Sequence, residues 1–184
     1  MQIHTERLVL RPFEISDLNT THEYAADFEN TRYMLFLPNK TLEESRQYLA
    51  WAASEWEKAE PVNLEFAITL GGKHIGAISI HLDKQSSTGE FGWILNKKYW
   101  GYGFMTEAAL AVKEFAVNRL KVKKLIAHCD SKNNVSQNVM KKIGMRMESF
   151  NERRQYPDSR GISGEYTYTC LLYTSPSPRD MRRS

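Results

Sequence analysis

Two closely spaced glycines, Gly101 and Gly103, stand between an apolar run that ends near Leu95 and a helical pattern that begins at about Met105. A glycine-rich turn leading into a helix directs unpaired backbone N–H groups and the positive end of the helix dipole at one point, which suits phosphate. A dinucleotide-binding fingerprint would need a third glycine where Thr106 stands, and the G-x-x-x-x-G-K-[ST] loop is absent. The segment predicts either a phosphate-binding loop or a tight strand-to-helix turn without a ligand.

The segments around this loop alternate between strand and helix patterns. Gly71 and Gly72 separate two runs of alternating apolar residues, which is typical of a tight antiparallel hairpin. Thr41 and Glu44 predict a capping box, in which the Thr41 hydroxyl accepts from the third helical amide and Glu44 accepts from the Thr41 amide. We expect strands over 5–13, 64–70, 74–80, 90–95, 124–129, 145–156 and 164–172, and helices over 18–28, 41–59, 105–120 and 133–142.

Three stretches together resemble the GNAT superfamily of N-acetyltransferases, and in particular its ribosomal-protein N-terminal (alanine/serine) acetyltransferase branch. They are TERLVLRPF at 5–13, YWGYGFMTEA at 99–108 and NNVSQNVMKKIGM at 133–145. The element order matches along about 170 residues. The resemblance implies an α/β (α+β) fold, with a central mixed, mostly antiparallel sheet of about seven strands and flanking helices. It also implies that the sheet splays between its fourth and fifth strands.

The resemblance implies acetyl-CoA as cosubstrate. The superfamily loop pattern Gln/Arg-x-x-Gly-x-Gly/Ala falls on Trp100-x-x-Gly103-x-Met105, so its first and last positions depart from the consensus. Because main-chain N–H groups bind the pyrophosphate, we expect the loop to work, with the Met105 side chain turned away. The Leu95 N–H would polarise the thioester carbonyl in the wedge between the splayed strands. The residues expected to bind the cofactor are Trp93, Ile94, Leu95, Trp100, Gly101, Tyr102, Gly103, Phe104, Met105, Thr106, Asn133 and Ser136.

The same resemblance suggests two catalytic residues. Ser136 matches a serine proposed to protonate the departing thiolate, although it could be a polar residue of the first helical turn. Glu90 lies where related enzymes place a carboxylate that takes the amine proton through water, although it could be a solvated charge. His81 and His128 are alternative bases, but a lone strand histidine is more often structural. Cys129 and a second cysteine at position 170 match no nucleophile motif.

The acceptor is expected to bind at the first-helix region and the link after it, with Glu29, Tyr33 and Phe36, and at the closing hairpin loop over 156–161. Acidic residues in the first region suit a cationic acceptor, whereas three arginines of the hairpin suit an acidic one, and the sequence leaves this open. The acceptor is a protein N-terminal α-amine or a small-molecule amine such as an aminoglycoside. A non-catalytic acyl-CoA-binding sensor is the alternative from another functional class.

Composition sets the remaining expectations for the 184 residues, of which 41% are hydrophobic and 26% charged. No signal peptide, membrane span or metal-binding cysteine motif is recognisable, so we expect a cytoplasmic protein without a metal. The net charge of +3 is too small to suggest nucleic acid binding. We expect one domain over 1–172, a homodimer contact at an exposed last strand, and a flexible Ser/Pro/Arg tail over 173–184 that resembles a non-native translated run-on.

Overall fold

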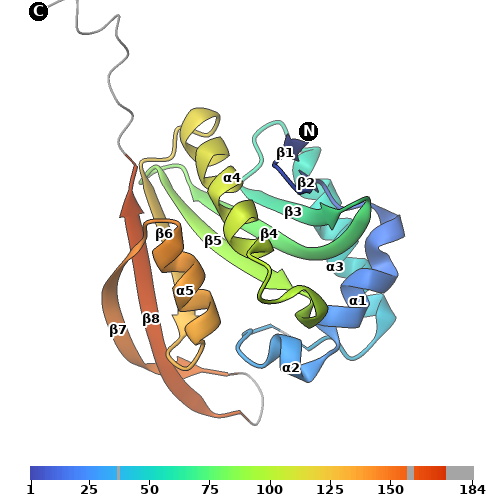
Figure 1. Ribbon diagram of the computed structural model, residues 1–184. Helices are drawn as coiled ribbons and strands as arrows, with labels where there is room; N and C mark the ends of the chain where they lie inside the picture. Colours follow the sequence, from blue (N-terminus) through green and yellow to red (C-terminus); the bar gives the residue numbers. More distant parts are fainter. Residues whose placement is uncertain (37, 157–159, 173–184) are drawn as a thin grey trace, which may run out of the picture.

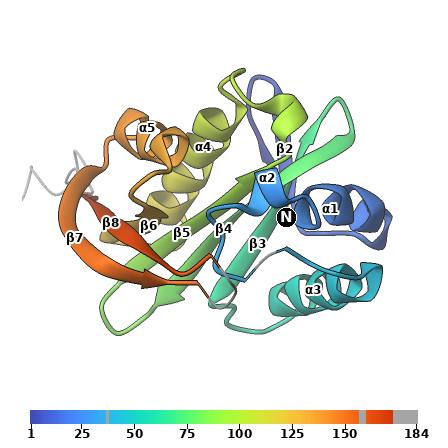
Figure 2. The same ribbon diagram turned by 90° about the horizontal axis from the view of Figure 1, so that it is seen from below.

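The computed structural model describes residues 1–36, 38–156 and 160–172, and the tail expected over 173–184 lies outside them. One sheet runs through the molecule in the strand order β1-β2-β3-β4-β5-β6-β8-β7. Helices α4 and α5 lie on one face of this sheet and α1 and α3 on the other (Figures 1 and 2). The strands are β1 (Ile3–His4), β2 (Leu8–Arg11), β3 (Asn63–Leu70), β4 (Lys73–Asp83), β5 (Thr88–Leu95), β6 (Lys124–Asp130), β7 (Arg146–Gln155) and β8 (Ile162–Leu171). The helices are α1 (Leu18–Ala25), α2 (Phe28–Thr31), α3 (Leu42–Trp56), α4 (Phe104–Asn118) and α5 (Asn134–Lys142), with short 3-10 turns η1 (Ile15–Asp17) and η2 (Lys97–Tyr99).

The expected mixed, mostly antiparallel sheet is confirmed, including the splay. Among the described strands, β5 and β6 form the parallel pair, and their register ends at Phe91 opposite Ala127. Residues 92–95 of β5 therefore have no β6 partner. The expected first strand is shorter and is preceded by β1, because Thr5 closes a turn in which the Leu8 amide donates to its hydroxyl at 2.9 Å. This turn gives eight strands where about seven were expected.

Two predictions about the helices were wrong in detail. The helix expected over 18–28 is divided, because the Asp27 carboxylate accepts from the Asn30 amide at 2.9 Å and so caps a new helix. Thr41 caps α3 as expected, accepting from the Glu44 amide at 3.2 Å. The Glu44 carboxylate, however, accepts from the Lys40 amide at 2.6 Å instead of the Thr41 amide. The capping box is therefore half formed.

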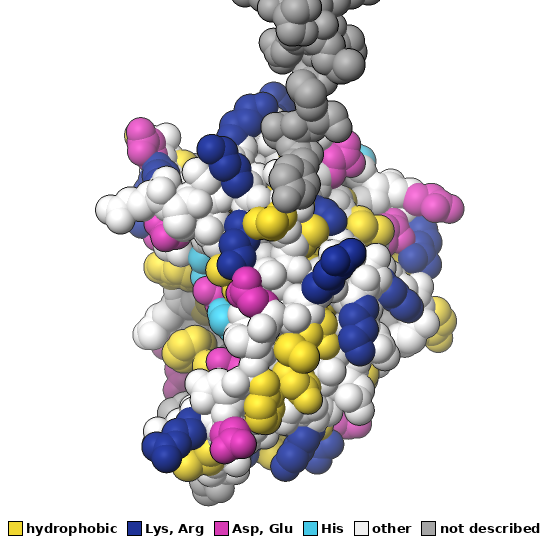
Figure 3. All heavy atoms as spheres, turned by 90° about the vertical axis from the view of Figure 1, so that its left-hand side faces the viewer, with side chains coloured by type: hydrophobic (Ala, Val, Ile, Leu, Met, Phe, Trp, Pro, Cys, Tyr) yellow, Lys and Arg dark blue, Asp and Glu magenta, His cyan; other side chains and the backbone are white. Residues whose placement is uncertain are grey.

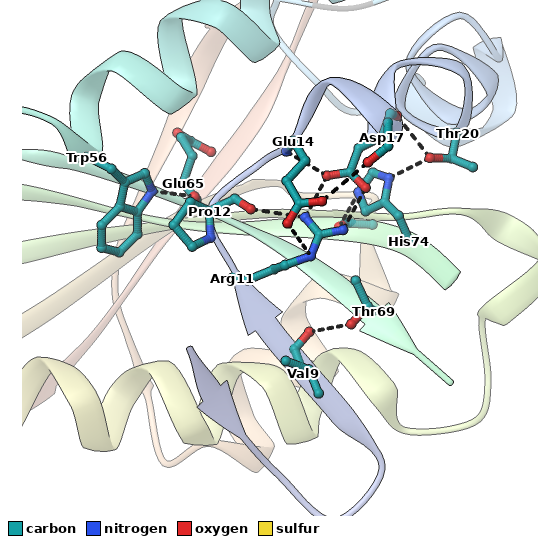
Figure 4. Close-up of polar contacts among 12 residues, drawn as sticks. Val9, Arg11, Pro12, Glu14, Asp17, Thr20, Trp56, Glu65, Thr69 and His74 are labelled. Atoms are coloured by element: carbon teal, nitrogen blue, oxygen red, sulfur yellow. Dashed lines mark hydrogen bonds and ion pairs between the residues drawn. The ribbon is translucent and has the colours of Figure 1, made fainter. Parts of the chain in front are cut away.

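A buried ion pair fixes β2 to the start of α1. The Arg11 guanidinium donates to both carboxylate oxygens of Asp17 at 2.7 and 2.8 Å, and the Glu14 amide donates to the same carboxylate at 2.9 Å (Figure 4). Burial raises the pKa of Asp17, but the hydrogen bonds from Arg11 and the Glu14 amide outweigh it, so the pKa is lowered overall. The stabilisation is therefore present above about pH 4 and is lost as the pH falls through the folded-state pKa.

Arg11→Ala is expected to lower the free energy of unfolding by about 3 kcal/mol, because Asp17 would remain as a buried charge without its partner. The matched control is Arg46→Ala, which breaks an exposed pair with Glu43 at 3.4 Å and should cost less than about 1 kcal/mol. Urea denaturation at pH 7 measures both. Equal losses in the two variants would contradict the role assigned to the Arg11–Asp17 pair.

The sequence predicted that the last strand would be exposed and would form a homodimer contact. The last strand, β8, is not an edge, because it lies between β6 and β7. The edge strand at that end of the sheet is β7. Figure 3 shows the face on this side of the molecule, where apolar side chains gather between lysines and arginines. The strands β7 and β8 contribute three exposed apolar residues, Met147, Phe150 and Ile162. Within the described residues, no helix has the length and apolarity needed to span a membrane.

Candidate functional site

The glycine loop adopts a backbone that favours glycine. Gly101 and Gly103 have φ values of 85° and 81°, in the left-handed region, and Gly103 is the N-cap of α4. The first intrahelical bond runs from the Glu107 amide to the Gly103 carbonyl at 3.0 Å. The amides of residues 104–106 therefore precede the internal hydrogen bonds of α4 and point out of its N-terminus. This arrangement can bind an anionic group, as the sequence predicted.

Arg7 holds the loop from the N-terminal end of the sheet. Its Nε donates to Oε2 of Glu107 at 2.7 Å, and its Nη1 donates to the Tyr102 carbonyl at 3.0 Å. The guanidinium also lies 4.5 Å from the centre of the Phe104 ring. Thr5 adds a hydrogen bond from its hydroxyl to Glu107 at 2.6 Å. Sequence reasoning used this segment as a motif but missed its role as a clamp on the loop.

The end of β5 is held open beside the loop. The Leu95 carbonyl accepts from the Trp100 indole at 2.7 Å and from the Asn30 side chain at 2.6 Å. The Asn96 amide donates to the Ile75 carbonyl of β4 at 2.9 Å. Because successive peptide groups of a strand point to opposite sides, the N–H of Leu95 is directed away from β4, toward the splay.

A cavity of about 530 Å³ lies between the loop, the end of β5 and α5. Of the residues expected to bind the cofactor, Tyr102 alone is absent from its lining; the Tyr102 ring is exposed and stacks on Phe104 with centroids 5.8 Å apart. Met105 is 7% exposed and belongs to the hydrophobic core, and it also contributes to the lining of this cavity. In the described part of the chain, no cluster of His, Cys, Asp and Glu side chains is placed to hold a metal ion.

Ser136 lies where this cavity meets a second one. Asn133 caps α5, because its side chain accepts from the Ser136 amide at 3.1 Å. The Ser136 hydroxyl accepts from the Trp93 indole N–H at 3.3 Å. These three residues line both the 530 Å³ cavity and a neighbouring cavity of about 680 Å³. The second cavity is called the acceptor cavity below.

The acceptor cavity is built on one face of β3, β4 and β5. Strand register aligns Glu65 with Ser79, and His81 with Glu90, so these polar side chains share a face. All four line the cavity. The opposite face carries apolar side chains packed against α4, which belong to the main core, including Phe66, Ile78, Ile80 and Phe91.

The residues expected to bind the acceptor are divided between the two cavities. Tyr33 and Phe36 line the acceptor cavity, and Phe36 is 92% exposed. Glu29 instead lines the cavity of about 530 Å³ beside the glycine loop, and its carboxylate pairs with Lys97 at 2.8 Å. Residues 157–159 of the expected closing loop lie outside the described residues.

Several charged residues that were expected to lie near the acceptor form ion pairs or hydrogen bonds with other residues of the protein. The hydrogen bond from Lys97, at 2.7 Å, is the main cause of a lowered pKa at Asp27. Arg154 pairs with Glu165 and donates to the Tyr33 carbonyl at 3.2 Å. Glu90, by contrast, has no hydrogen bond or ion pair with any described residue.

The histidines and cysteines occupy distinct environments. His74 is buried, and its ring contacts the Thr20 hydroxyl at 2.7 Å and the Gly76 carbonyl at 2.9 Å, so it is structural. His128 also lines the acceptor cavity and contacts the Thr167 hydroxyl at 3.1 Å. Burial raises the pKa of Cys129 to about 11, so at neutral pH it is a thiol and a weak nucleophile. Cys170 is partly buried.

Comparison with known proteins agrees with this geometry. The family model "Acetyltransferase (GNAT) domain" matches residues 7–146. The uncharacterized N-acetyltransferase YnaD of Bacillus subtilis (strain 168) is 31% identical over 173 residues, covering 93% of this chain and 97% of that protein.

Two solved structures are similar along nearly the whole chain. A GNAT-family acetyltransferase from Bacillus anthracis has a TM-score of 0.80 at 32% identity, covering 93% of this chain and 98% of its own. RimL, a ribosomal L7/L12 α-N-protein acetyltransferase in complex with coenzyme A, has a TM-score of 0.84 at 15% identity, covering 94% and 98%, which shows a shared fold. The chain therefore belongs to the GNAT family of acetyltransferases.

Proposed function

We propose that this protein transfers the acetyl group of acetyl-CoA to a primary amine by direct attack in a ternary complex. The observation that carries the proposal is the meeting of two cavities at Ser136, one lined by the glycine loop and one by the polar strip of the sheet. A thioester lying at this junction would face an amine in the acceptor cavity. Holding both reactants in place supplies much of the rate enhancement in such a transfer.

The residues present fit acetyl-CoA on two independent observations. The left-handed glycines and the free N-terminus of α4 suit a pyrophosphate. The unpaired edge of β5 offers strand hydrogen bonds to an extended amide-bearing arm, and the Leu95 N–H can donate to the thioester oxygen. The related fold of RimL is in complex with coenzyme A.

Ser136 is proposed to protonate the departing thiolate. Its oxygen already accepts from the Trp93 indole at 3.3 Å, which leaves its own O–H proton to be donated. The amine is proposed to release its proton to a group on the β4–β5 wall of the acceptor cavity. On this wall the carboxylate of Glu90 has no partner among the described residues, so it can attract a cationic amine.

The acceptor is proposed to be a cationic amine with an apolar neighbouring group. Aromatic side chains of Tyr33, Phe36 and Trp51 line the cavity together with the polar strip. RimL acts on a protein α-amine, and a volume of about 680 Å³ accommodates either a short N-terminal peptide or a drug-sized amine. An α-amine, with a pKa of about 7.7–8.0, needs less help to lose its proton than a lysine-like amine near 10.4.

Release of coenzyme A thiol from acetyl-CoA tests the proposal. The panel contains peptides with free alanine or serine N-termini, spermidine, kanamycin and free amino acids. Release with one acceptor class, and acetylated product in mass spectrometry, is the expected result. Stabilisation of the fold by acetyl-CoA with no turnover on any acceptor would instead favour a non-catalytic acyl-CoA sensor, and absence of both would exclude the cofactor assignment.

A further inference from the structure

A chain of three side chains crosses the floor of the acceptor cavity. The Tyr48 hydroxyl of α3 donates to Oε2 of Glu65 at 2.9 Å, and Nε2 of His81 lies 2.9 Å from Oε1 of the same carboxylate. Glu65 is buried, whereas the His81 side chain keeps 46% of its surface exposed and lines the cavity. The Glu65 main chain is held as well, because its carbonyl accepts from the Trp56 indole at 2.9 Å (Figure 4).

This arrangement determines which nitrogen of neutral His81 can accept a proton. An ionised carboxylate only accepts hydrogen bonds, so the contact with Glu65 requires the proton to be on Nε2. Nδ1 then carries the lone pair and is not engaged by Glu65. A histidine oriented by a buried carboxylate through one ring nitrogen, with the other nitrogen free, is arranged as a general base.

Glu90 occupies the position beside this histidine. His81 and Glu90 are directly opposite each other in the β4–β5 register, and directly opposite side chains have Cβ atoms about 4.5–5.5 Å apart. The amine that enters the acceptor cavity therefore meets both groups together. Glu90 was expected from the sequence, whereas Glu65 and its hydrogen bond from Tyr48 could not be identified from motifs.

We propose that His81, oriented by Glu65 and Tyr48, takes the proton from the acceptor amine, and that Glu90 supports the positive charge this creates. The inference rests on the proposed acetyl transfer. The attacking species is the neutral form of the amine, which has already lost its first proton to solvent. As the N–C bond forms and the C–S bond breaks, the nitrogen loses one further N–H proton to Nδ1 of His81. The sulfur gains one proton from Ser136. His81 then releases its proton to solvent and Ser136 regains one, so neither residue is consumed.

The surroundings of His81 tune it for this task. The hydrogen bond with Glu65 raises the pKa of His81 above its usual 6.5, burial opposes the shift, and the charges of Glu65, Glu90 and Glu55 raise it further. These groups lie on β3, β5 and α3, the elements that pack around His81. Burial raises the pKa of Tyr48 well above 10, so Tyr48 remains a hydrogen-bond donor. Activity should therefore fall as the pH drops through a value above 6.5.

The test compares four variants of the full chain on the best acceptor of the panel. His81→Gln is expected to lower kcat at least 100-fold and to remove the acidic limb of the kcat/KM profile. Glu65→Gln and Glu90→Gln should move that limb to lower pH, because each removes a charge that raises the pKa of His81. His4→Gln removes an exposed histidine of β1 and should leave kcat unchanged. Acetyl-CoA affinity should be the same in all four.

Two results would overturn the inference. The first is a His81→Gln variant that keeps kcat within threefold of the native value with its acidic limb intact, while Glu90→Gln loses activity, which would make Glu90 the base. The second needs no acceptor: ¹⁵N NMR of the imidazole should show neutral His81 protonated at Nε2, and protonation at Nδ1 would contradict the geometry. Inactivity of the native protein on the whole panel would count against the proposed function instead, and the NMR result would still be informative.

Discussion

Replacing Ser136 with alanine is expected to lower kcat for acetyl transfer about 100-fold while changing acetyl-CoA affinity less than twofold. A positioned proton donor contributes about 10²–10⁴-fold to rate, and the Ser136 hydroxyl lies where the two cavities meet. Its indole partner Trp93 orients the oxygen at 3.3 Å without using the serine proton. Steady-state kinetics with the best acceptor, and calorimetry with acetyl-CoA, measure the two quantities separately.

Ser136→Thr is the matched control, because it keeps a hydroxyl in the first turn of α5. It should retain kcat within about tenfold of the native value, as expected where a proton donor is retained but shifted. If Ser136→Ala and Ser136→Thr behave alike and both remain fully active, Ser136 is a polar residue of the helix start and another group protonates the thiolate.

The second large effect concerns the glycine loop. In Gly101→Ala/Gly103→Ala, two side chains would occupy the left-handed region, at a cost of about 1–2 kcal/mol each. Few atoms stand in the way: a Cβ at Gly101 has no neighbour within 4 Å, and one at Gly103 meets only an Arg7 nitrogen at 3.6 Å. The backbone conformation, and not a clash, is therefore what the substitution changes. We expect acetyl-CoA affinity to fall about 30-fold to several hundred-fold as the loop relaxes.

Gly71→Ala/Gly72→Ala provides a strain-matched control away from the site. Gly71 and Gly72 have φ values of 55° and 82° in the β3–β4 turn, and a Cβ at either position has no neighbour within 4 Å. The control should lose stability but keep its acetyl-CoA affinity. Thermal denaturation with and without acetyl-CoA separates the effects, because ligand stabilisation grows with the logarithm of the ratio of ligand concentration to Kd. Equal loss of ligand stabilisation in both proteins would contradict a specific role of the loop.

Local signals in the sequence predicted most of the helices and strands and the conformation of the glycine loop. The Gly71–Gly72 turn and the loop at Gly101 and Gly103 each depend on backbone conformations that a few adjacent residues determine. Predictions failed where a neighbouring group offered a competing hydrogen bond. The Glu44 carboxylate accepts from the Lys40 amide and not from the Thr41 amide, and the Asp27 side chain caps a separate helix, α2.

The acceptor side could not be predicted in the same way, because its contacts join distant residues. Arg154, for example, donates to the Tyr33 carbonyl across 121 positions of the sequence. Glu65 and His81 stand on different strands, and their pairing depends on a register that only the folded sheet specifies. Glu90 and His81 were both candidates from the sequence, but their positions opposite each other on β5 and β4 were not predicted.

Because strand pairing between β5 and β6 ends early, the sheet consists of two parts that are joined over a short stretch. Beyond Phe91 and Ala127, no strand register couples the part built by β1–β5 to the part built by β6–β8. The first part carries the glycine loop and the His81 face, and the segment from Lys124 onward carries α5, β7 and β8. A chimera that exchanges this segment between family members would thus replace the α5 side of the two cavities and keep the residues that β3, β4 and β5 contribute. The end of the β5–β6 pairing is thus a boundary at which the α5 side of both cavities can be exchanged while the residues of β3–β5 stay the same.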